Sequence, residues 1–292
     1  MFSCRIENYT NDILTLTQNE NDFQVINIEG LNPPNAQINI SAVAGMDGAK
    51  FNSSKLDTRN LVIYIKICGD IERNRLKLYS FFVTKQWCKF YYKNNSLDVF
   101  IEGYIESVEC GLFTDNETMQ VSVICTDPYF KSAQEIINDI SKVVKLFEFP
   151  FAIEYEPSPM INHRYGIEFS RFEANRIVYL DGNSATGIII EAEIYQPVKK
   201  IEILKVDENL HFTLKYDFRT SDRIIINTAK GHKSAVLIRD DDRINLFTAI
   251  EKGSVFFQLK TGENSFTYRI DDMIHDRDVT MRIRHRNQYQ GV

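Results

Sequence analysis

The stretch GMDGAKFNSSKLDTRNLVIYIKICGDIERNRLKLYSFF, from Gly45 to Phe82, determines the fold expected for the first half of the chain. Its start, Gly45–Gly48, has the glycines and the aspartate of a turn, and a loop is expected over residues 49–59. From Asn60 apolar and polar residues alternate, and this period of two predicts a strand with one buried face. The buried face would carry Leu61, Ile63, Ile65 and Ile67.

A helix is expected directly after this strand. Gly69 would end the strand, and Asp70 has the side chain of a good helix N-cap. The following residues place an apolar stripe on one side of a helix and polar residues on the other. The stripe would contain Ile71, Leu78 and Phe82 with Tyr79 beside them, and the solvated residues would be Arg73, Asn74 and Lys77.

Composition indicates a folded chain of about two domains. The 292 residues are 43% hydrophobic and 25% charged, with a formal net charge of −6. Up to Pro150 there are 14 Lys and Arg against 19 Asp and Glu, which makes this half −5. An acidic chain is a poor binder of nucleic-acid phosphates. We expect no secretory leader, and the most apolar run, Ile188–Ile190, is too short to span a membrane.

The cysteines indicate reduced thiols rather than a disulfide framework. There are five, none in a CxxC pair, and all lie in the first half. We expect buried thiols in a protein made in a cytoplasm.

Short strands linked by turns are expected through the rest of the first half, with antiparallel hairpin connections. Asn32–Asn35, with two prolines, predicts a loop or an extended arm. A capping box of Ser132 and Glu135 predicts a short helix carrying Ile136, Ile137, Ile140 and Val144. The expected strands are Ile13–Thr17, Phe23–Gly30, Gln37–Ala42, Trp87–Tyr92, Leu97–Ile105 and Met119–Cys125.

The second half reads as almost all strand, and its spacing predicts a β-sandwich. The predicted division is 1–130, then a helix and linker over 131–160, then 161–292 as the sandwich. The fold class is therefore mainly β with few helices. Candidate strands are Tyr165–Phe172, Arg176–Leu180, Gly187–Tyr195, Lys200–Lys205, His211–Tyr216, Arg223–Asn227, Ala235–Arg239, Val255–Leu259, Phe266–Ile270 and Val279–His285.

No catalytic, cofactor-binding or metal-binding residue is predicted, and no enzyme activity. The chain has no HExxH, Walker A or GxGxxG motif. Gly182–Thr186 is one residue short of a nucleophile elbow and reads as a turn. Asp240–Asp242 could touch a cation, but a solvated turn between strands is favoured. The histidines have no metal-ligand spacing: His163, His211, His232, His275 and His285.

The last strand carries a basic face, and three tyrosines could form aromatic platforms. Between the arginines, Val279, Met281 and Ile283 alternate, which favours a polar outer face over a contact with an acidic neighbour. For the tyrosines, packing on a sheet or in the core is favoured over sugar binding. The residues are Arg277, Arg282, Arg284 and Arg286, and Tyr165, Tyr179 and Tyr195.

The ordered set of motifs resembles the distal tail protein family of tailed phages, called Dit, of the siphovirus-type tail component superfamily. One departure is Leu180–Ser184, where the family more often has Asn-Gly-Asp. The matching motifs are Leu31–Pro34, Gly48–Asn52, Thr58–Ile63, Gly69–Glu72 with Arg75, Leu78 and Tyr79, then Tyr91–Tyr92, Gly103–Glu106, Gln120–Cys125, Asp127–Phe130, Asp222–Thr228, Gly253–Ser254, Leu259–Asn264 and Tyr289–Val292.

The resemblance implies a structural role at the tail tip. It implies a barrel-like N-terminal domain with one packed helix that forms a homo-hexameric ring and joins the tail tube protein to the hub, a Tal-like protein. It also implies a galectin-like or carbohydrate-module-like sandwich that supports the adhesion device. Further expected partners are the tape measure and receptor-binding proteins, with DNA only in transit. The expected location is the virion tail tip, after assembly in the bacterial cytoplasm, in a phage or a phage-derived bacteriocin.

Two further readings stay open from the residues. Glu102 and Glu106 are candidates to line an acidic lumen, because an acidic wall repels DNA. Closing a ring requires two non-identical faces on each subunit, which the arm at Pro33–Pro34 and exposed strand edges could supply. The alternative function is a carbohydrate-binding module for a host-surface glycan.

Overall fold

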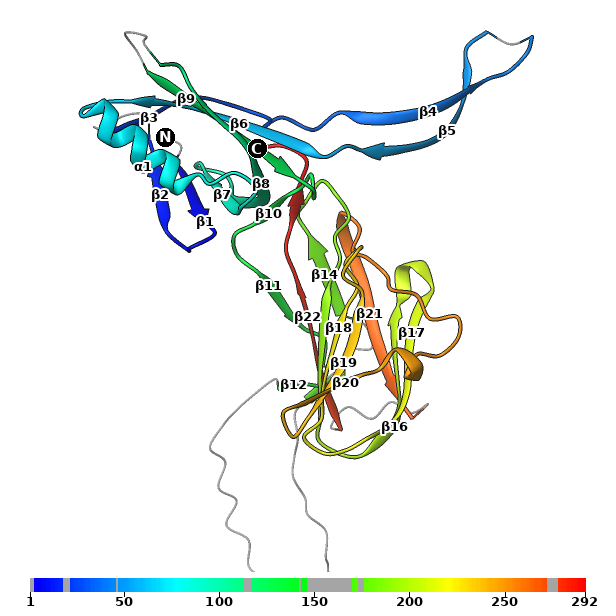
Figure 1. Cartoon of the computed structure of the whole chain (residues 1–292). Helices are drawn as coiled ribbons and strands as arrows, with labels where there is room; N and C mark the ends of the chain where they lie inside the picture. The colour runs from blue at the N-terminus through cyan, green and yellow to red at the C-terminus, as the bar shows by residue number, and fades with distance from the viewer. Residues whose placement is uncertain are drawn as a thin grey trace, which may run out of the picture. The chain divides into compact units, whose positions relative to one another are not determined.

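The computed structural model describes a mainly β chain that divides into two compact units (Figure 1). The first, called the barrel unit, contains Met1–Glu135, Gly182–Ser184 and Arg286–Val292. The second, called the sandwich unit, contains Ile136–Asp181 and Ala185–His285. The described residues are 3–17, 22–45, 47–112, 117–141, 143–145, 170–172, 176–271 and 278–292.

Seven strands of the barrel unit form an antiparallel sheet in the order β2-β1-β7-β8-β9-β6-β3. An isolated parallel bridge between Thr17 and Gln24, with a hydrogen bond of 3.3 Å from the Val25 amide to the Thr17 carbonyl, brings the two ends of this sheet together in a barrel-like arrangement. The strands are β1 (Ser3–Asn8), β2 (Ile13–Leu16), β3 (Phe23–Glu29), β6 (Arg59–Ile67), β7 (Trp87–Lys93), β8 (Asp98–Cys110) and β9 (Thr118–Cys125).

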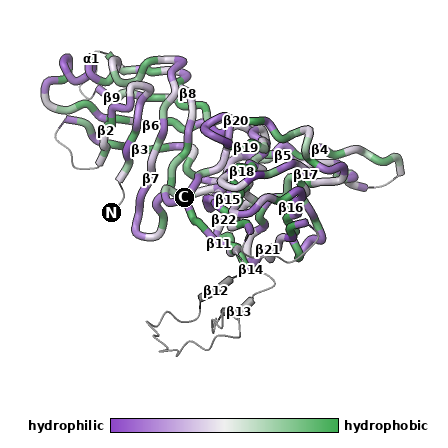
Figure 2. The backbone as a smooth tube through the Cα atoms, turned by 90° about the horizontal axis from the view of Figure 1, so that it is seen from below, coloured by the Kyte–Doolittle hydropathy of each residue, from purple (hydrophilic) through white to green (hydrophobic). Residues whose placement is uncertain are grey.

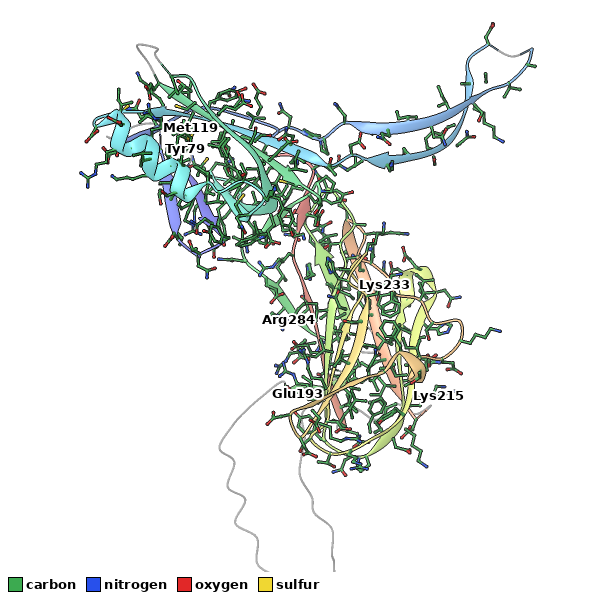
Figure 3. All side chains as sticks on the ribbon, viewed as in Figure 1. Tyr79, Met119, Glu193, Lys215, Lys233 and Arg284 are labelled. Atoms are coloured by element: carbon green, nitrogen blue, oxygen red, sulfur yellow. The ribbon has the colours of Figure 1, made fainter. Side chains whose placement is uncertain are left out.

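The predicted strand–helix segment lies at the centre of this unit. Leu61, Ile63, Ile65 and Ile67 of β6 are buried as predicted, and Met119, labelled in Figure 3, is buried in the same core. The helix α1 (Ile71–Phe81) is the only α-helix in the described part of the chain, and its tube in Figure 2 is largely hydrophilic in colour. The predicted mainly β fold with one packed helix is confirmed.

The details of α1 differ in part from the prediction. Asp70 is the N-cap, since its carboxylate accepts a hydrogen bond of 3.2 Å from the Arg73 amide. Leu78 is buried, but Ile71 is exposed. Asn74, which was expected to be solvated, is buried, because its side-chain amide donates to the Cys68 carbonyl at 2.8 Å and so ties the helix to the end of β6.

A long hairpin separates β3 from β6. It consists of β4 (Ala36–Ala42) and β5 (Ala49–Leu56), which pair only with each other and form a two-stranded ribbon (Figure 1). The prediction of a loop over residues 49–59 was wrong for β5. The sequence hides this strand because its residues are mostly polar and none is fully buried. We call Ala36–Leu56 the arm.

The sandwich unit contains two antiparallel sheets around one apolar core. One sheet has the order β11-β22-β15-β18-β19-β20, and the other has the order β14-β21-β16-β17. The predicted sandwich is confirmed, and its likeness to galectins or carbohydrate modules stays a prediction. The strands are β11 (Ile136–Asp139), β14 (Arg176–Leu180), β15 (Ile189–Ile194), β16 (Val198–Lys205), β17 (Leu210–Phe218), β18 (Arg223–Asn227), β19 (Ser234–Arg239), β20 (Asp242–Asn245), β21 (Gly262–Ile270) and β22 (Val279–His285).

Two sequence predictions fail in this region. The expected helix after Ser132 is absent from residues 132–141, where Ile136–Asp139 instead form β11 and pair with β22 along the edge of a sheet. This tertiary pairing outweighs the local capping-box signal. Val255–Leu259 forms no strand, and only Leu259 makes a bridge, to Thr186. Short further elements are β10 (Phe130–Ser132), β12 (Val143–Lys145), β13 (Ser170–Phe172), β23 (Gln288–Tyr289) and the 3₁₀ turns Val206–Glu208 and Phe247–Ala249.

Candidate assembly surface

The arm has one apolar face, and both faces of the arm are exposed to solvent. In its register, Ile40 lies opposite Phe51 and Ile38 lies opposite Ser54. Directly opposed residues of an antiparallel pair point to the same face. The face therefore carries Ala36, Ile38, Ile40 and Ala42 from β4 and Leu56, Ser54, Phe51 and Ala49 from β5.

A β-bulge at Asn52 holds Phe51 on this apolar face. The pairing shifts between Asn39, which lies opposite Ser53, and Ile40, which lies opposite Phe51, so Asn52 is the extra residue. A bulge of one residue reverses which side chains point to each face beyond it. The side-chain amide of Asn52 donates to the Ser41 hydroxyl across the hairpin and so bonds the bulge to β4.

The other face of the arm is polar and basic. It carries the opposed pairs Gln37 with Lys55, Asn39 with Ser53, and Ser41 with Lys50. The ribbon is therefore amphipathic, although it has no core of its own.

The apolar side chains of the arm are mostly in water. Ile38 is 63% exposed, Ile40 58% and Phe51 60%. Burying one such side chain completely contributes about 1.5–3 kcal/mol. A monomeric protein seldom exposes a continuous apolar strip, so the arm has the character of a contact surface.

The root of the arm is fixed by a buried arginine. Arg59, at the start of β6, donates from Nε to the Pro128 carbonyl at 2.8 Å and from Nη1 to the Gly30 and Asn32 carbonyls, the latter at 2.7 Å. Its guanidinium lies 4.6 Å from the centre of the Phe130 ring. Burial lowers the pKa of Arg59, and interaction with Cys125 opposes this shift. The Gly30 and Asn32 carbonyls lie where the β3–β6 pairing stops and the arm begins.

Gly30 allows the chain to leave the barrel at this point. Its φ is +86°, and a Cβ there would lie 2.1 Å from the Asn60 carbonyl oxygen. Only glycine combines this left-handed conformation with so close an approach to β6.

A second exposed apolar area lies on the same unit, between α1 and the β1–β2 hairpin. It is a groove of about 780 Å³ whose apolar lining includes Ile13, Leu14, Leu76 and Phe81. Ile13 and Leu76 are exposed. Charged side chains from Asp12, Asp70, Glu72, Arg73 and Lys77 border it. Sequence reasoning missed this groove because β1 was not predicted.

Glu102 and Glu106 both lie on the outer surface of the barrel wall. They are exposed on β8 and alternate with the buried Ile101 and Ile105. Glu102 lies 3.3 Å from the Lys89 ammonium, and Glu106 accepts a hydrogen bond of 2.9 Å from the Ser122 hydroxyl. Their orientation toward a lumen stays a prediction.

The basic face of β22 is engaged within the chain. Arg284 pairs with Glu191 at 2.5 Å, and Arg286 donates to the Ser132 carbonyl at 2.9 Å. Arg282 approaches Asp139 at 3.9 Å. Val279, Met281 and Ile283 are buried between them, which confirms the predicted polar outer face. Arg277 lies outside the described residues.

The remaining candidates form no reactive cluster in the described part of the chain. No group of three potential metal-binding side chains is found there, and Gly182–Thr186 connects β14 to β15 as the predicted turn region. Asp240 and Asp241 form the two-residue turn between β19 and β20, each with positive φ. His211 and His232 belong to loops or strand surfaces and His285 is buried, whereas His163, His275 and Tyr165 lie outside the described residues.

The structure also shows the exposure of the candidate tyrosines and of the cysteines. Tyr179 and Tyr195 stand exposed on the sandwich surface. All five cysteines are free thiols, and Cys4, Cys88 and Cys125 are buried as predicted, whereas Cys68 and Cys110 are only half-buried. In the described residues no helix combines the length and the apolarity needed to cross a membrane.

Comparison with known proteins points to phage tails. Residues 181–289 match the family model of the siphovirus-type tail component, C-terminal domain. The crystal structure of the Dit protein of phage SPP1, described as a paradigm of the hub adsorption apparatus in phages that infect Gram-positive bacteria, is similar over 98% of this chain and 99% of that chain, with a TM-score of 0.66 and 14% identity. A chain of the phage P2 baseplate in its activated conformation with Ca is similar over 100% of both chains, with a TM-score of 0.51 and 11% identity. No curated protein matches the chain significantly.

The proteins to which this chain is similar are all phage tail or baseplate components. Over residues 181–289 the predicted resemblance is borne out by the family model, and over the whole chain the fold is similar to that of the Dit protein of phage SPP1.

Proposed function

We propose that this chain is a structural subunit of a phage or phage-derived tail tip and assembles into a homo-hexameric ring. The observation that carries the proposal is the arm, an amphipathic ribbon with an exposed apolar face. The fold and the match of residues 181–289 support it independently. The number six is taken from the family resemblance.

The arm and the groove supply the two different faces that a ring requires. A contact between non-identical faces repeats from subunit to subunit until the circle closes. The arm of one copy would place Ile38, Ile40 and Phe51 on the groove beside Leu76 of the next copy.

The ring would join the tail tube to the tail-tip hub at the end of the virion, after assembly in the host cytoplasm. Tape measure and receptor-binding proteins would be further partners. The sandwich unit would support the adhesion device, and Glu102 and Glu106 would face a lumen that passes DNA. A mainly structural role requires no catalytic group.

Mixing two defective variants tests the ring contact. Ile40→Asp damages the arm and leaves the groove intact, whereas Leu76→Asp damages the groove and leaves the arm intact. Each variant alone should be monomeric by light scattering after size exclusion, because every contact needs one arm and one groove. Their mixture should form a heterodimer and nothing larger, while the unchanged chain forms a ring visible by negative stain. If the unchanged chain stays monomeric at high concentration, the ring proposal is overturned.

A carbohydrate-binding module is the second candidate, favoured by the exposed rings of Tyr179 and Tyr195. Retention on immobilised host glycans that is lost in Tyr179→Ala or Tyr195→Ala would support it. A monomeric chain that is retained in this way would favour this candidate over the ring.

A further inference from the structure

Residues 286–292 belong to the barrel unit, although they follow the sandwich unit in the sequence. Within this segment β23 pairs with β10, so that Tyr289 lies opposite the buried Phe130. The Ser132 amide donates to the Asn287 carbonyl at 2.9 Å, and the Asn287 amide donates to the Ser132 hydroxyl at 3.1 Å. The last segment therefore completes a unit that the first residues of the chain begin.

This segment reaches the buried guanidinium at the root of the arm. Nη2 of Arg59 donates to the Gln290 carbonyl, while the same guanidinium holds the carbonyls of Gly30, Asn32 and Pro128. One side chain thus gathers three separate parts of the chain at the point where the arm leaves the barrel. A guanidinium suits this task, since its five N–H donors have a fixed planar geometry.

Direct contacts add to this connection. The Val292 amide donates to the Leu31 carbonyl at 3.1 Å. A Cβ built on Gly291 would lie 2.8 Å from Cδ of Pro33, so the segment packs against the proline loop without room for a side chain. Leu31 and Pro33 are the residues that lead from β3 into the arm.

The loop Gly182–Ser184 holds the segment from another side. The Asn183 amide donates to the Gln288 carbonyl at 3.0 Å, and the Gln290 amide donates to the Asn183 side-chain oxygen at 2.8 Å. A Cβ on Gly182 would lie 2.5 Å from the Gln288 carbonyl oxygen. The segment is therefore hydrogen-bonded along its length.

We propose that Arg286–Val292 is a latch that fixes the direction of the arm by locking its root through Arg59, Leu31 and Pro33. Because the latch is made after the sandwich unit, a growing chain gains a correctly directed arm only once that unit has been synthesised. Incomplete chains then cannot enter an assembly. This consequence for assembly rests on the proposed ring function, whereas the lock on the arm root does not.

Gly291→Ala tests the latch with one added methyl group. It should push the segment away from Pro33, and Gln290→Ala is the matched control because it keeps the backbone carbonyl that Arg59 binds. The readout is hydrogen exchange in peptides that cover β5 and Asp57, whose amide donates to the Asn35 carbonyl across the arm root at 3.2 Å. Exchange there should rise about ten-fold in Gly291→Ala, as expected for local opening, and stay unchanged in Gln290→Ala.

Arg59→Lys is a second variant, which keeps the charge but cannot reach all the carbonyls together, and it should show the same rise. If both variants show faster exchange at Val292 but no change at Asp57, the latch proposal is overturned. Sizing of the same samples separates the two proposals. If the unchanged chain is monomeric and the variants still raise the exchange rate of the Asp57 amide, the ring proposal is rejected and the latch proposal stands. If the unchanged chain forms a ring and both variants leave the hydrogen exchange of the arm unaltered, only the latch proposal is rejected.

Discussion

Phe51 lies directly opposite Ile40 across the arm, although strict alternation counted from Leu56 would turn Phe51 to the other face. The extra residue Asn52 accounts for the difference, since a bulge changes the parity of the strand. Without it, Lys50 and Asn52 would share a face with Ile38 and Ile40. The bulge therefore creates the continuous apolar strip on which the proposed contact depends.

Deletion of Asn52 should preserve assembly and leave the barrel folded. It removes only the extra residue, so the shortened β5 would pair in regular register with Phe51 still opposite Ile40. Sizing should show the ring, and the melting temperature should stay within a few degrees of the unchanged chain because the arm has almost no buried residues. Ile40→Asp, which places a charge on the apolar face, is the negative control and should be monomeric. Monomers of the deletion variant would contradict this account of the bulge.

The sequence predicted what is local and regular. The alternation of Leu61, Ile63, Ile65 and Ile67 identified β6, and the Asp70 carboxylate identified the start of α1, because each signal lies within a few residues. The strand β5 escaped prediction because a two-sided solvated ribbon with a bulge has no buried period.

Long-range features could not be predicted in this way. Arg59 appears in the sequence as one charged residue before a strand, yet it binds the carbonyl of Gln290, 231 positions away. Asn74 appears as a polar helix residue, yet it is buried against the Cys68 carbonyl. Both depend on backbone groups that the fold leaves without ladder partners, and these cannot be located before the topology is known.

Residues far along the chain complete the barrel unit, which has a consequence for a first-half fragment. A chain cut at about Phe149 lacks Gly182–Ser184 and Arg286–Val292, which belong to the barrel unit. Its Arg59 would lose the Gln290 acceptor, and Phe130 would lose the cover of Tyr289. We therefore expect this fragment to be less stable than a version in which residues 136–285 are replaced by a Gly–Ser linker. Thermal melting should show the difference, and equal melting temperatures would contradict it.

A buried ion pair should make the sandwich unit sensitive to acid. Burial alone would raise the pKa of the Asp222 carboxyl, but hydrogen bonds from Arg239, at 2.8 and 2.6 Å, and from the Arg219 amide outweigh it and lower that pKa. A lowered pKa in the folded state means that the stabilisation is present above the unfolded value and is lost as pH falls through the folded value. Asp222→Ala should cost about 3–5 kcal/mol at neutral pH, because it leaves a largely buried arginine unpaired.

The matched control for this pair lies on the surface. Asp98→Ala removes the exposed partner of Lys93, 2.8 Å away, and should cost at most about 1 kcal/mol. Urea unfolding followed at pH 7 and below pH 4 measures both effects, and the cost of Asp222→Ala should shrink at the lower pH. A cost that is independent of pH would show that the pair contributes by packing alone.

The buried thiols should make the barrel unit sensitive to alkali. Desolvation by burial raises the pKa of Cys4, Cys88 and Cys125 from 9.0 to about 12. The unfolded chain therefore releases these protons first, so the stability is complete below pH 9 and falls as pH rises toward 12. Thiol titration with an aromatic disulfide at pH 8 should leave these three unreactive until urea is added, whereas the half-buried Cys68 should react sooner. Cys88→Ala should reduce the alkaline slope of the unfolding free energy, and an unchanged slope would show that this thiol does not ionise on unfolding.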